Sequence, residues 1–249
     1  MIVRDNSRLV LNPDDNPALG FACELKKLYP DVFIDVISMA PESVIDLARD
    51  ILRINTDRFL LLSDSAFAGS DTFATSTVLA KCLSLRHYDV ILSGTHSIDG
   101  DTAHVPSQIA EALHIGQISN ILSVHELDFE KLYAIVETEH DNTLSKYKIR
   151  LPAILSFDRN SKYKSPFVRF SDIDLFVDDR IKRQTGAELG LSAEQTGLKG
   201  SLTVVKETYS IFGVEREPVF VSTDDEGIET VYRFLEEKGF VNGEDADLL

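Results

Sequence analysis

The stretch that decides the fold runs from Phe59 to Val105 and reads FLLLSDSAFAGSDTFATSTVLAKCLSLRHYDVILSGTHSIDGDTAHV. Two apolar runs, at 59–62 and 90–92, each end in a small polar cluster, and each cluster is followed by apolar residues at helical spacing. Short apolar runs without alternation are typical of strands buried on both faces of a parallel sheet. The stretch therefore predicts strand, polar loop and helix, twice in succession.

The two polar clusters, at 63–77 and 93–102, should lie at one edge of that sheet. Ligands of doubly wound sheets bind at the carboxyl ends of the strands, which is where both clusters would stand. We interpret the clusters as two walls of a nucleotide site.

The rest of the first 160 residues repeats the alternation of strand and helix. The expected strands are 32–37, 59–62, 90–92 and 152–157, with helices at 18–28, 43–52, 73–83 and 105–113 and short antiparallel strands at 121–127, 131–139 and 144–151. This order is typical of a doubly wound α/β fold. We expect residues 32–157 to form one mixed, mostly parallel sheet of the Rossmann-like, adenine-nucleotide-binding type.

Beyond Phe157 the pattern loosens, which suggests a division into residues 1–160 and 161–249. Residues 158–201 carry many charges and little periodicity, and a segment of this length is usually functional or lies on a partner. Short extended pieces are expected at 204–209 and 218–221. An amphipathic helix is expected at 225–238.

Composition excludes several classes of function. The chain has 41 acidic and 25 basic residues, for a net charge of −16, which argues against nucleic-acid binding. No apolar run approaches the roughly 18 residues of a membrane helix. Cys23 and Cys82 form neither a metal-binding spacing nor a disulfide framework. We expect a cytoplasmic protein that does not bind membranes.

The first polar motif is Gly69-Ser70-Asp71-Thr72-Phe73-Ala74-Thr75-Ser76. Its glycine and hydroxyls crowd the first turn of a helix, where free amides and the helix dipole favour an anion such as phosphate. The simpler alternative is a helix cap by Ser70 or Asp71. It is not a P-loop, because no Gly-Lys-Ser/Thr follows.

The second polar motif is Gly94-Thr95-His96-Ser97-Ile98-Asp99-Gly100-Asp101-Thr102-Ala103. Its two acids could bind a metal, although they are too few for a calcium site. Asp101 or Thr102 could instead cap the next helix. In the third interpretation, the backbone amides and hydroxyls wrap an adenosine and its phosphates.

A third motif, Asn12-Pro13-Asp14-Asp15, indicates by itself only the start of a helix. The six histidines show no metal spacing, and neither a nucleophile elbow nor a recognisable acid–base pair of carboxylates is present. These motifs indicate a cradle for a nucleotide without bond-breaking machinery.

Taken together, the motifs resemble one known family. NPDD (12–15), SDSAFAGSDTFATS (63–76), GTHSIDGDTAHVPSQIAEAL (94–113), LPAILSFDRN (151–160) and TGLKGS (196–201) follow the order found in the beta subunit of electron transfer flavoproteins. The resemblance covers roughly Ile2 to Val241. It raises the nucleotide interpretation of both loops above the capping alternatives.

The resemblance implies a heterodimer with an alpha subunit, holding an FAD that carries electrons between dehydrogenases. The beta subunit itself holds AMP or a second FAD. The family pattern implies cofactor contacts at Asn12, Pro13, Asp14, Asp15, Met39, Asp71, Thr72, Thr75, Ser76, Gly94, His96, Ser97, Ile98, Asp99, Gly100, Asp101, Thr102, Ala103 and Val105. Catalytic residues and metal ligands are not implied.

The DTxATS turn at 71–76 and the TGLKGS segment are similar to the electron-bifurcating branch, in which a beta-bound FAD accepts hydride from NADH. The segment near 162–179 corresponds to a loop that docks a partner dehydrogenase of the acyl-CoA type. The C-terminal part corresponds to an arm that reaches across to the alpha subunit.

The chain departs from the family pattern at three places. Family members begin with a strand and a Lys-x-Val-Pro-Asp loop that precede the point where Met1 aligns, so this first strand is expected to be missing. Thr95-His96 stands where relatives carry a basic residue and glutamine, and Lys162-Tyr163 stands where they carry Pro-Arg. The alternative function is a non-redox nucleotide-binding or scaffolding module of the same fold.

Overall fold

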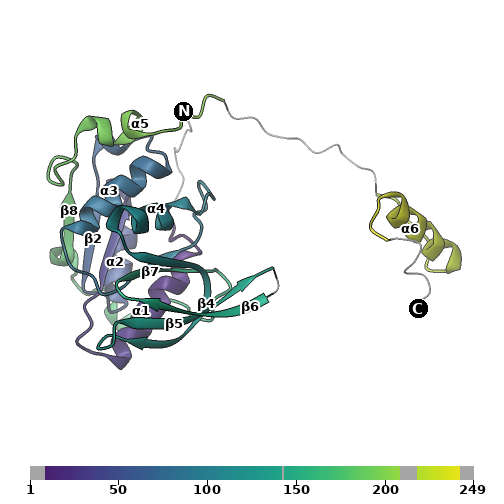
Figure 1. Ribbon diagram of the computed structural model, residues 1–249, viewed down its shortest axis with the longest axis horizontal. Coiled ribbons are helices and arrows are strands. Elements are labelled where there is room, and N and C mark those ends of the chain that lie inside the picture. The colour runs from purple at the N-terminus through teal and green to yellow at the C-terminus, as the bar shows by residue number, and fades with distance from the viewer. Residues whose placement is uncertain (1–8, 142, 208–217, 242–249) are drawn as a thin grey trace. The chain divides into compact units, whose positions relative to one another are not determined.

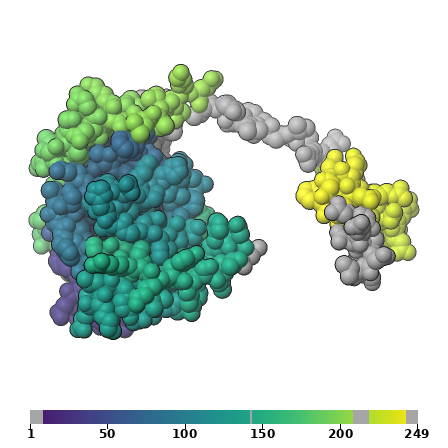
Figure 2. Space-filling model, viewed as in Figure 1, coloured from purple at the N-terminus to yellow at the C-terminus, as the bar shows by residue number. Residues whose placement is uncertain are grey.

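A computed structural model describes residues 9–141, 143–207 and 218–241 and divides into two compact units, Met1–Val204 and Val205–Leu249. Figures 1 and 2 show the first unit as a closely packed body of helices and strands. Its elements are α1 (Asp15–Leu28), β1 (Asp35–Met39), α2 (Ile45–Arg53), β2 (Arg58–Leu62), α3 (Thr72–Ser84), β3 (Ile91–Gly94), α4 (His104–Leu113), β4 (Gly116–Asp128), β5 (Tyr133–His140), β6 (Thr143–Arg150), β7 (Ala153–Phe157), β8 (Ile181–Gln184) and α5 (Gly197–Gly200).

The strands form two hydrogen-bonded sheets. One is parallel, in the order β1-β2-β8, and the other has the order β3-β7-β4-β5-β6. In the second sheet β3, β7 and β4 run parallel, while β4, β5 and β6 pair antiparallel. In the described part of the chain, β1 is the terminal strand of one sheet and β3 is the terminal strand of the other. The expectation of one mixed sheet is therefore wrong.

The central strands are buried on both faces, as the apolar runs predict. In β2, Phe59 and Leu61 pack with α1 and α2, whereas Leu60 and Leu62 pack with α3. In β7, Ile154 is the residue that packs in one cluster with residues of α3 and α4. Helices thus cover both faces, and the α/β fold with doubly wound parallel strands is confirmed.

The two terminal strands β1 and β3 are more exposed than the central ones. Every residue of β1 is half-buried, and so are the first three of β3, whereas β7 is buried throughout. Ile37 of β1 and Ile91 of β3 nevertheless pack against the same cluster from α3 and α4. Within the described residues, each of these strands pairs with another strand on one side only, which leaves the backbone groups of the other edge without a strand partner.

Two boundaries differ from expectation. β1 begins at Asp35 rather than residue 32, because Phe33 stays exposed and Ile34 N donates to Asp57 Oδ2 at 2.7 Å. β8 lies in the segment expected to be irregular, and it pairs with β2. Since it does, the first compact unit extends to Val204 instead of ending at residue 160.

The second unit contains α6 (Asp225–Glu237), close to the predicted helix. Asp224 Oδ1 caps it by accepting from Gly227 N at 3.0 Å. Ile228, Val231 and Phe234 are exposed along it. Residues 204–207 and 218–221 contain no strand, and 208–209 of the first predicted piece lie outside the described residues. In the described chain, no helix has the length and apolar character needed to cross a membrane.

Candidate functional site

The start of α1 is tied to the end of β3. Asp15 Oδ1 accepts from Gly94 N at 2.6 Å, and Asp14 Oδ2 accepts from His96 N at 3.2 Å. Neither acid caps its own helix. A Cβ on Gly94 would lie 2.6 Å from the Asp14 carbonyl carbon, so only glycine permits this approach. The NPDD motif therefore does more than begin a helix.

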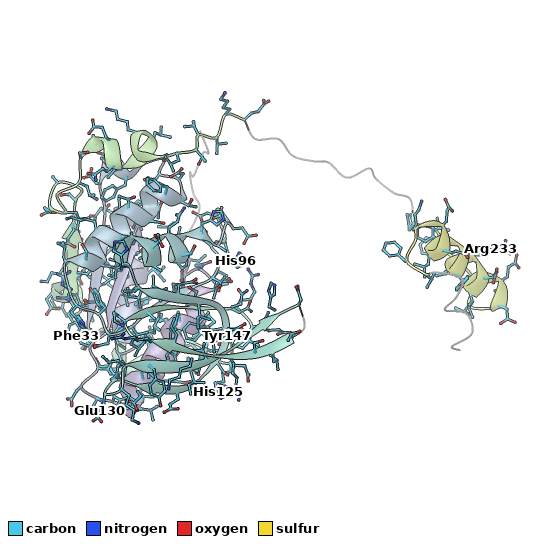
Figure 3. The ribbon with its side chains drawn as sticks, in the orientation of Figure 1. Phe33, His96, His125, Glu130, Tyr147 and Arg233 are labelled. Atoms are coloured by element: carbon cyan, nitrogen blue, oxygen red, sulfur yellow. The ribbon has the colours of Figure 1, made fainter. Side chains whose placement is uncertain are left out.

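Asn12 completes this junction through its amide nitrogen, while its amide oxygen is not used there. Its Nδ2 donates to Asp15 Oδ2 at 3.1 Å and to His96 O at 2.7 Å, which uses both amide hydrogens. Its Oδ1 is buried and has no hydrogen-bond partner among the described residues. His96 Nδ1 is also buried, and it lies 3.0 Å from Asp101 Oδ1 without hydrogen-bond geometry. Figure 3 labels His96 in the loop after β3.

The two carboxylates of the motif differ in their surroundings. Burial raises the pKa of the Asp15 carboxyl, and hydrogen bonds from Gly94 and Asn12 offset part of that rise. The Asp14 side chain is 3% exposed and accepts from Arg159 Nε at 3.1 Å. The site thus holds a buried carboxylate next to a cation from the end of β7.

Sequence reasoning missed Arg159 and Thr95 as parts of the site. Arg159 belongs to the quoted LPAILSFDRN segment, which is the signal that could have identified it. Thr95 is 5% exposed, and its Oγ1 accepts from Asn120 N at 3.2 Å. Thr95 therefore serves the junction between β3 and β4 rather than solvent.

The second motif forms an exposed loop that leads into α4. Asp101 has φ +46° and Ala103 has φ +55°, left-handed values that cost L-residues about 1–3 kcal/mol each. Ala103 is the N-cap of α4 and makes no side-chain cap, so capping by Asp101 or Thr102 is wrong. Backbone amides of the first turn of a helix that has no cap are available to an anion.

The remaining residues of this loop are accessible. Ser97, Ile98, Asp99, Gly100, Asp101 and Thr102 are exposed, and Val105 is half-buried. Gly100 N donates to Asp99 Oδ1 at 2.9 Å and Asp101 N to Ser97 O at 2.9 Å. Among the described residues, no group of three or more His, Cys, Asp or Glu side chains could hold a metal ion.

The first motif forms the start of α3, and there the capping alternative is confirmed. Asp71 Oδ1 accepts from Ala74 N at 2.9 Å. Ser76 is 3% exposed, and its hydroxyl lies 2.7 Å from Thr72 O and 2.8 Å from Gln108 Oε1. Ser76 thus joins α3 to α4, while Thr72 and Thr75 are half-buried.

These elements bring the predicted residues to one region. α3 and α4 lie side by side (Figure 1), and Ile37 of β1 and Ile91 of β3 pack against the cluster that these two helices form. Met39 ends β1 and packs with Leu60 and Leu62 beneath α3. The arrangement combines the uncapped first turn of α4, a buried acceptor at Asn12 and a cation at Arg159.

The predicted docking segment at 162–179 carries charged residues and exposed aromatic side chains. Tyr163 at its start is buried, and its ring packs at a tilt of 54° against that of Phe21, with the ring centroids 4.9 Å apart. Its hydroxyl accepts from Val124 N at 2.9 Å. Beyond it, Phe167 is 94% and Phe170 93% exposed. Such exposed aromatic side chains are typical of an interaction surface.

Comparison with known proteins gives consistent matches. The family model described as "Electron transfer flavoprotein domain" matches residues 1–165. The chain is 32% identical over 208 residues to "Electron transfer flavoprotein subunit beta" of Thermoanaerobacterium thermosaccharolyticum, covering 83% of this chain and 78% of that one. It is 32% identical to "Caffeyl-CoA reductase-Etf complex subunit CarD" of Acetobacterium woodii, covering 84% and 79%. It is 28% identical to "Protein FixA" of Sinorhizobium fredii, covering 92% and 82%.

Proposed function

The chain belongs to the electron transfer flavoprotein family and has the role of a beta subunit, and we propose that it holds FAD, or AMP in its place, between the first turns of α1, α3 and α4. The flavin would supply the redox chemistry, and the protein would bind and orient it. The predicted contacts from Asn12 to Val105 are part of the proposal, except that the side chains of Asp71 and Ser76 are bound by protein groups and shape the site without contacting the ligand.

The observation that carries the proposal is the unpartnered Asn12 Oδ1. A buried polar atom without a hydrogen bond costs about 1–3 kcal/mol, so native proteins rarely leave one. Because both hydrogens of the Asn12 amide are already donated, the amide cannot flip to remove the problem. Oδ1 therefore fits a ligand that brings a donor, such as the exocyclic amine of adenine.

The anionic end of the nucleotide would lie at the first turn of α4. Its cap position carries no side-chain acceptor, and two left-handed residues shape the approach. Strained non-glycine residues of this kind cluster at functional sites. The Arg159 side chain is 58% exposed, and its guanidinium adds a positive charge next to Asp14, which binds the backbone of the loop at His96.

The partners follow from the same family role. An alpha subunit is the expected partner of a beta subunit, and the exposed apolar face of α6 is suited to pack against it. Segment 162–179, with Phe167 and Phe170, would dock a dehydrogenase. NADH as donor and an acyl-CoA-dehydrogenase-type acceptor are the finer form of the proposal. The two buried free thiols agree with a reducing compartment such as the cytoplasm.

The test is made on the chain co-purified with its alpha subunit. Bound nucleotide is released, separated and quantified per heterodimer, next to the absorption spectrum of the intact complex. Two FAD per heterodimer support a bifurcating flavoprotein, and one FAD with one AMP supports an electron carrier with a structural nucleotide here. Absence of any nucleotide from this subunit would refute the proposal and favour a scaffolding module.

A pair of variants locates the site. Asn12→Leu removes the orphaned acceptor and should lower nucleotide retention about tenfold, the equivalent of one hydrogen bond of about 1.4 kcal/mol. Asn16→Ala is the matched control, because the Asn16 amide is satisfied at both ends by Ser165 at 2.8 and 3.1 Å. It should lower stability while the nucleotide content stays at the wild-type level.

A further inference from the structure

Both oxygens of the Asp71 carboxylate accept hydrogen bonds from the protein itself. Oδ1 accepts from Ala74 N at 2.9 Å in the first turn of α3. Oδ2 accepts from both Thr203 N and Thr203 Oγ1, each at 2.9 Å. In addition, Asp71 N donates to Ser201 Oγ at 2.8 Å. A ligand phosphate would meet a negative charge here rather than a free donor.

The segment that Asp71 holds is fastened along the whole polar loop before α3. Gly197 N donates to Ser70 Oγ at 3.1 Å. A Cβ on Gly197 would lie 2.3 Å from Ala66 O, and Gly197 has φ +57°, so this close approach requires glycine. Leu198 lies over Gly69 on the outer side. Residues 196–203 therefore pack directly against one of the two predicted walls of the nucleotide site.

Thr203 also stands at a boundary. The first compact unit ends at Val204, and the chain then continues into the second unit, Val205–Leu249, which we call the C-terminal arm. The Asp71 side chain, which belongs to the wall of the nucleotide site, therefore holds Thr203, two residues before the C-terminal arm begins. One carboxylate thereby joins the turn that would face the ligand to the segment that leads to the partner-binding part of the chain.

A second aspartate, Asp64, attaches a distant segment to the same loop in the same way. Asp64 Oδ1 accepts from Ala66 N at 2.9 Å, and its Oδ2 accepts from Gly186 N at 3.0 Å. Asp64 thus pairs one local and one distant donor, as Asp71 does. Its distant segment, however, continues within the first unit, so only Asp71 combines the nucleotide-site wall with the start of the arm.

We propose that Asp71 is a positioning residue that couples nucleotide binding at the α3 wall to the attachment of the C-terminal arm at Thr203. This inference rests on the proposed function, because it needs a nucleotide at that wall. Binding that orders the first turn of α3 also orders Thr203, and by linkage the loss of the Thr203 attachment weakens nucleotide binding by the same factor.

The test uses Thr203→Val, which removes the hydroxyl donor, keeps the shape of the side chain and lies outside every predicted ligand contact. Affinity for pure AMP and pure FAD is measured on the heterodimer after nucleotide has been stripped. Hydrogen exchange of residues 201–204 is followed with and without each nucleotide. We expect at least about fivefold weaker nucleotide binding, and loss of the slowing of exchange that nucleotide produces in the wild type.

Thr185→Val is the matched control. Thr185 N and Oγ1 donate to Glu188 Oε2 at 2.7 and 2.9 Å, the same pattern as Thr203 on Asp71, but the acceptor here is not the N-cap of α3. It should leave nucleotide affinity unchanged. Asp71→Asn keeps one acceptor oxygen, so it can hold Ala74 or Thr203 but not both, and it should reproduce the effect of Thr203→Val.

The outcomes separate the two ideas. If the wild type binds nucleotide and Thr203→Val binds it equally well, the coupling is refuted and the proposed function stands. If exchange at 201–204 is the same with and without nucleotide, the coupling is likewise refuted. If the wild-type heterodimer binds neither AMP nor FAD in this subunit, the proposed function fails and the coupling fails with it.

Discussion

Arg159 Nε donates a hydrogen bond to Asp14 Oδ1 at 3.1 Å, joining residues 145 positions apart in the sequence. The bond connects the start of α1 to the loop after β7. Because the Asp14 side chain is almost fully buried, the ion pair with the largely exposed Arg159 stabilises a carboxylate whose other hydrogen-bond donor is His96 N. Arg159 thereby contributes to the site through the position of Asp14.

Replacing Arg159 should therefore lower both the stability of the protein and its retention of nucleotide. Arg159→Ala leaves the Asp14 carboxylate with His96 N as its remaining donor, and we expect a loss of about 1–2 kcal/mol in the free energy of unfolding. Denaturant titration measures the loss, with nucleotide retention followed in parallel. Arg183→Ala is the control, since its ion pair with Glu42 is exposed and should contribute less than about 0.5 kcal/mol. Equal effects of the two variants would contradict the assignment.

The loop before α4 predicts a specific loss of ligand. Asp101→Ala removes the carboxylate beside His96 Nδ1 and should reduce nucleotide retention several-fold without unfolding the chain. Asp141 is a close counterpart for comparison, because it also has a left-handed φ, +47°, and lies 3.4 Å from a histidine nitrogen. Asp141→Ala should retain all of the nucleotide, and a loss in both variants would point to a general effect of such substitutions.

The hydroxyls of α3 divide into two kinds. Thr75→Val should lower nucleotide retention with little change in stability, because the Thr75 side chain is half-buried at the proposed site. Ser76→Ala removes a buried hydroxyl that joins α3 to α4 and should destabilise the protein by about 1–2 kcal/mol. Thermal unfolding and nucleotide content of both variants test this division. Unchanged nucleotide content in Thr75→Val would remove Thr75 from the site.

Acid should weaken the attachment at Asp64. Hydrogen bonds from Ala66 and Gly186 lower the pKa of this carboxyl below its usual range. A pKa that is lower in the folded state stabilises the fold above the unfolded value of about 3.9, and this contribution is lost as pH falls through the folded pKa. Asp64→Asn should therefore be less stable than wild type near pH 7 and approach it below about pH 3.

The measurement is urea unfolding across that pH range, with exposed Asp174→Asn as the control. The buried Asp15 carboxyl has the opposite effect on stability, because burial raises its pKa in the folded state. Its charged form destabilises the fold, and this destabilisation decreases as pH falls and the carboxyl is protonated. Comparing each variant with wild type at the same pH removes this shared contribution. A difference between Asp64→Asn and wild type that does not change with pH would refute the titration of Asp64.

The open edges of the two sheets make a further prediction. Amides of β1 and β3 should exchange with solvent at least about tenfold faster than those of β2 and β7, because each of the two strands has a paired neighbour on one side only among residues 9–141, 143–207 and 218–241. Hydrogen exchange read by mass spectrometry resolves these strands. Equal protection of all four would mean that another segment covers the edges of β1 and β3 in solution.

Much of the fold could be predicted because the decisive signals are local. The uninterrupted apolar runs of β2 and β7, with helical spacing between such runs, depend only on burial on both faces and on the helical period. For the same reason, the amphipathic helix α6 was placed within a residue of its bounds. Family motifs then marked both polar loops.

Other features arise only from long-range pairing. β8 is a four-residue strand whose sequence, IKRQ, has no strand signal, and it exists because it pairs with β2. The separation into two sheets depends on which strands become neighbours, which periodicity does not encode. The roles of Arg159 and Thr203 likewise depend on partners more than a hundred residues away.

The sequence by itself determined the α/β class, the order of its elements and the two polar loops, because hydrophobic period and turn chemistry are properties of neighbouring residues. The tertiary structure decided which of those polar residues are free. It satisfied Asp71 and Ser76 with protein donors and acceptors, and it left Asn12 Oδ1 buried without a partner in the part of the chain that the structure describes. A residue becomes available to a ligand only when folding brings no other partner to it.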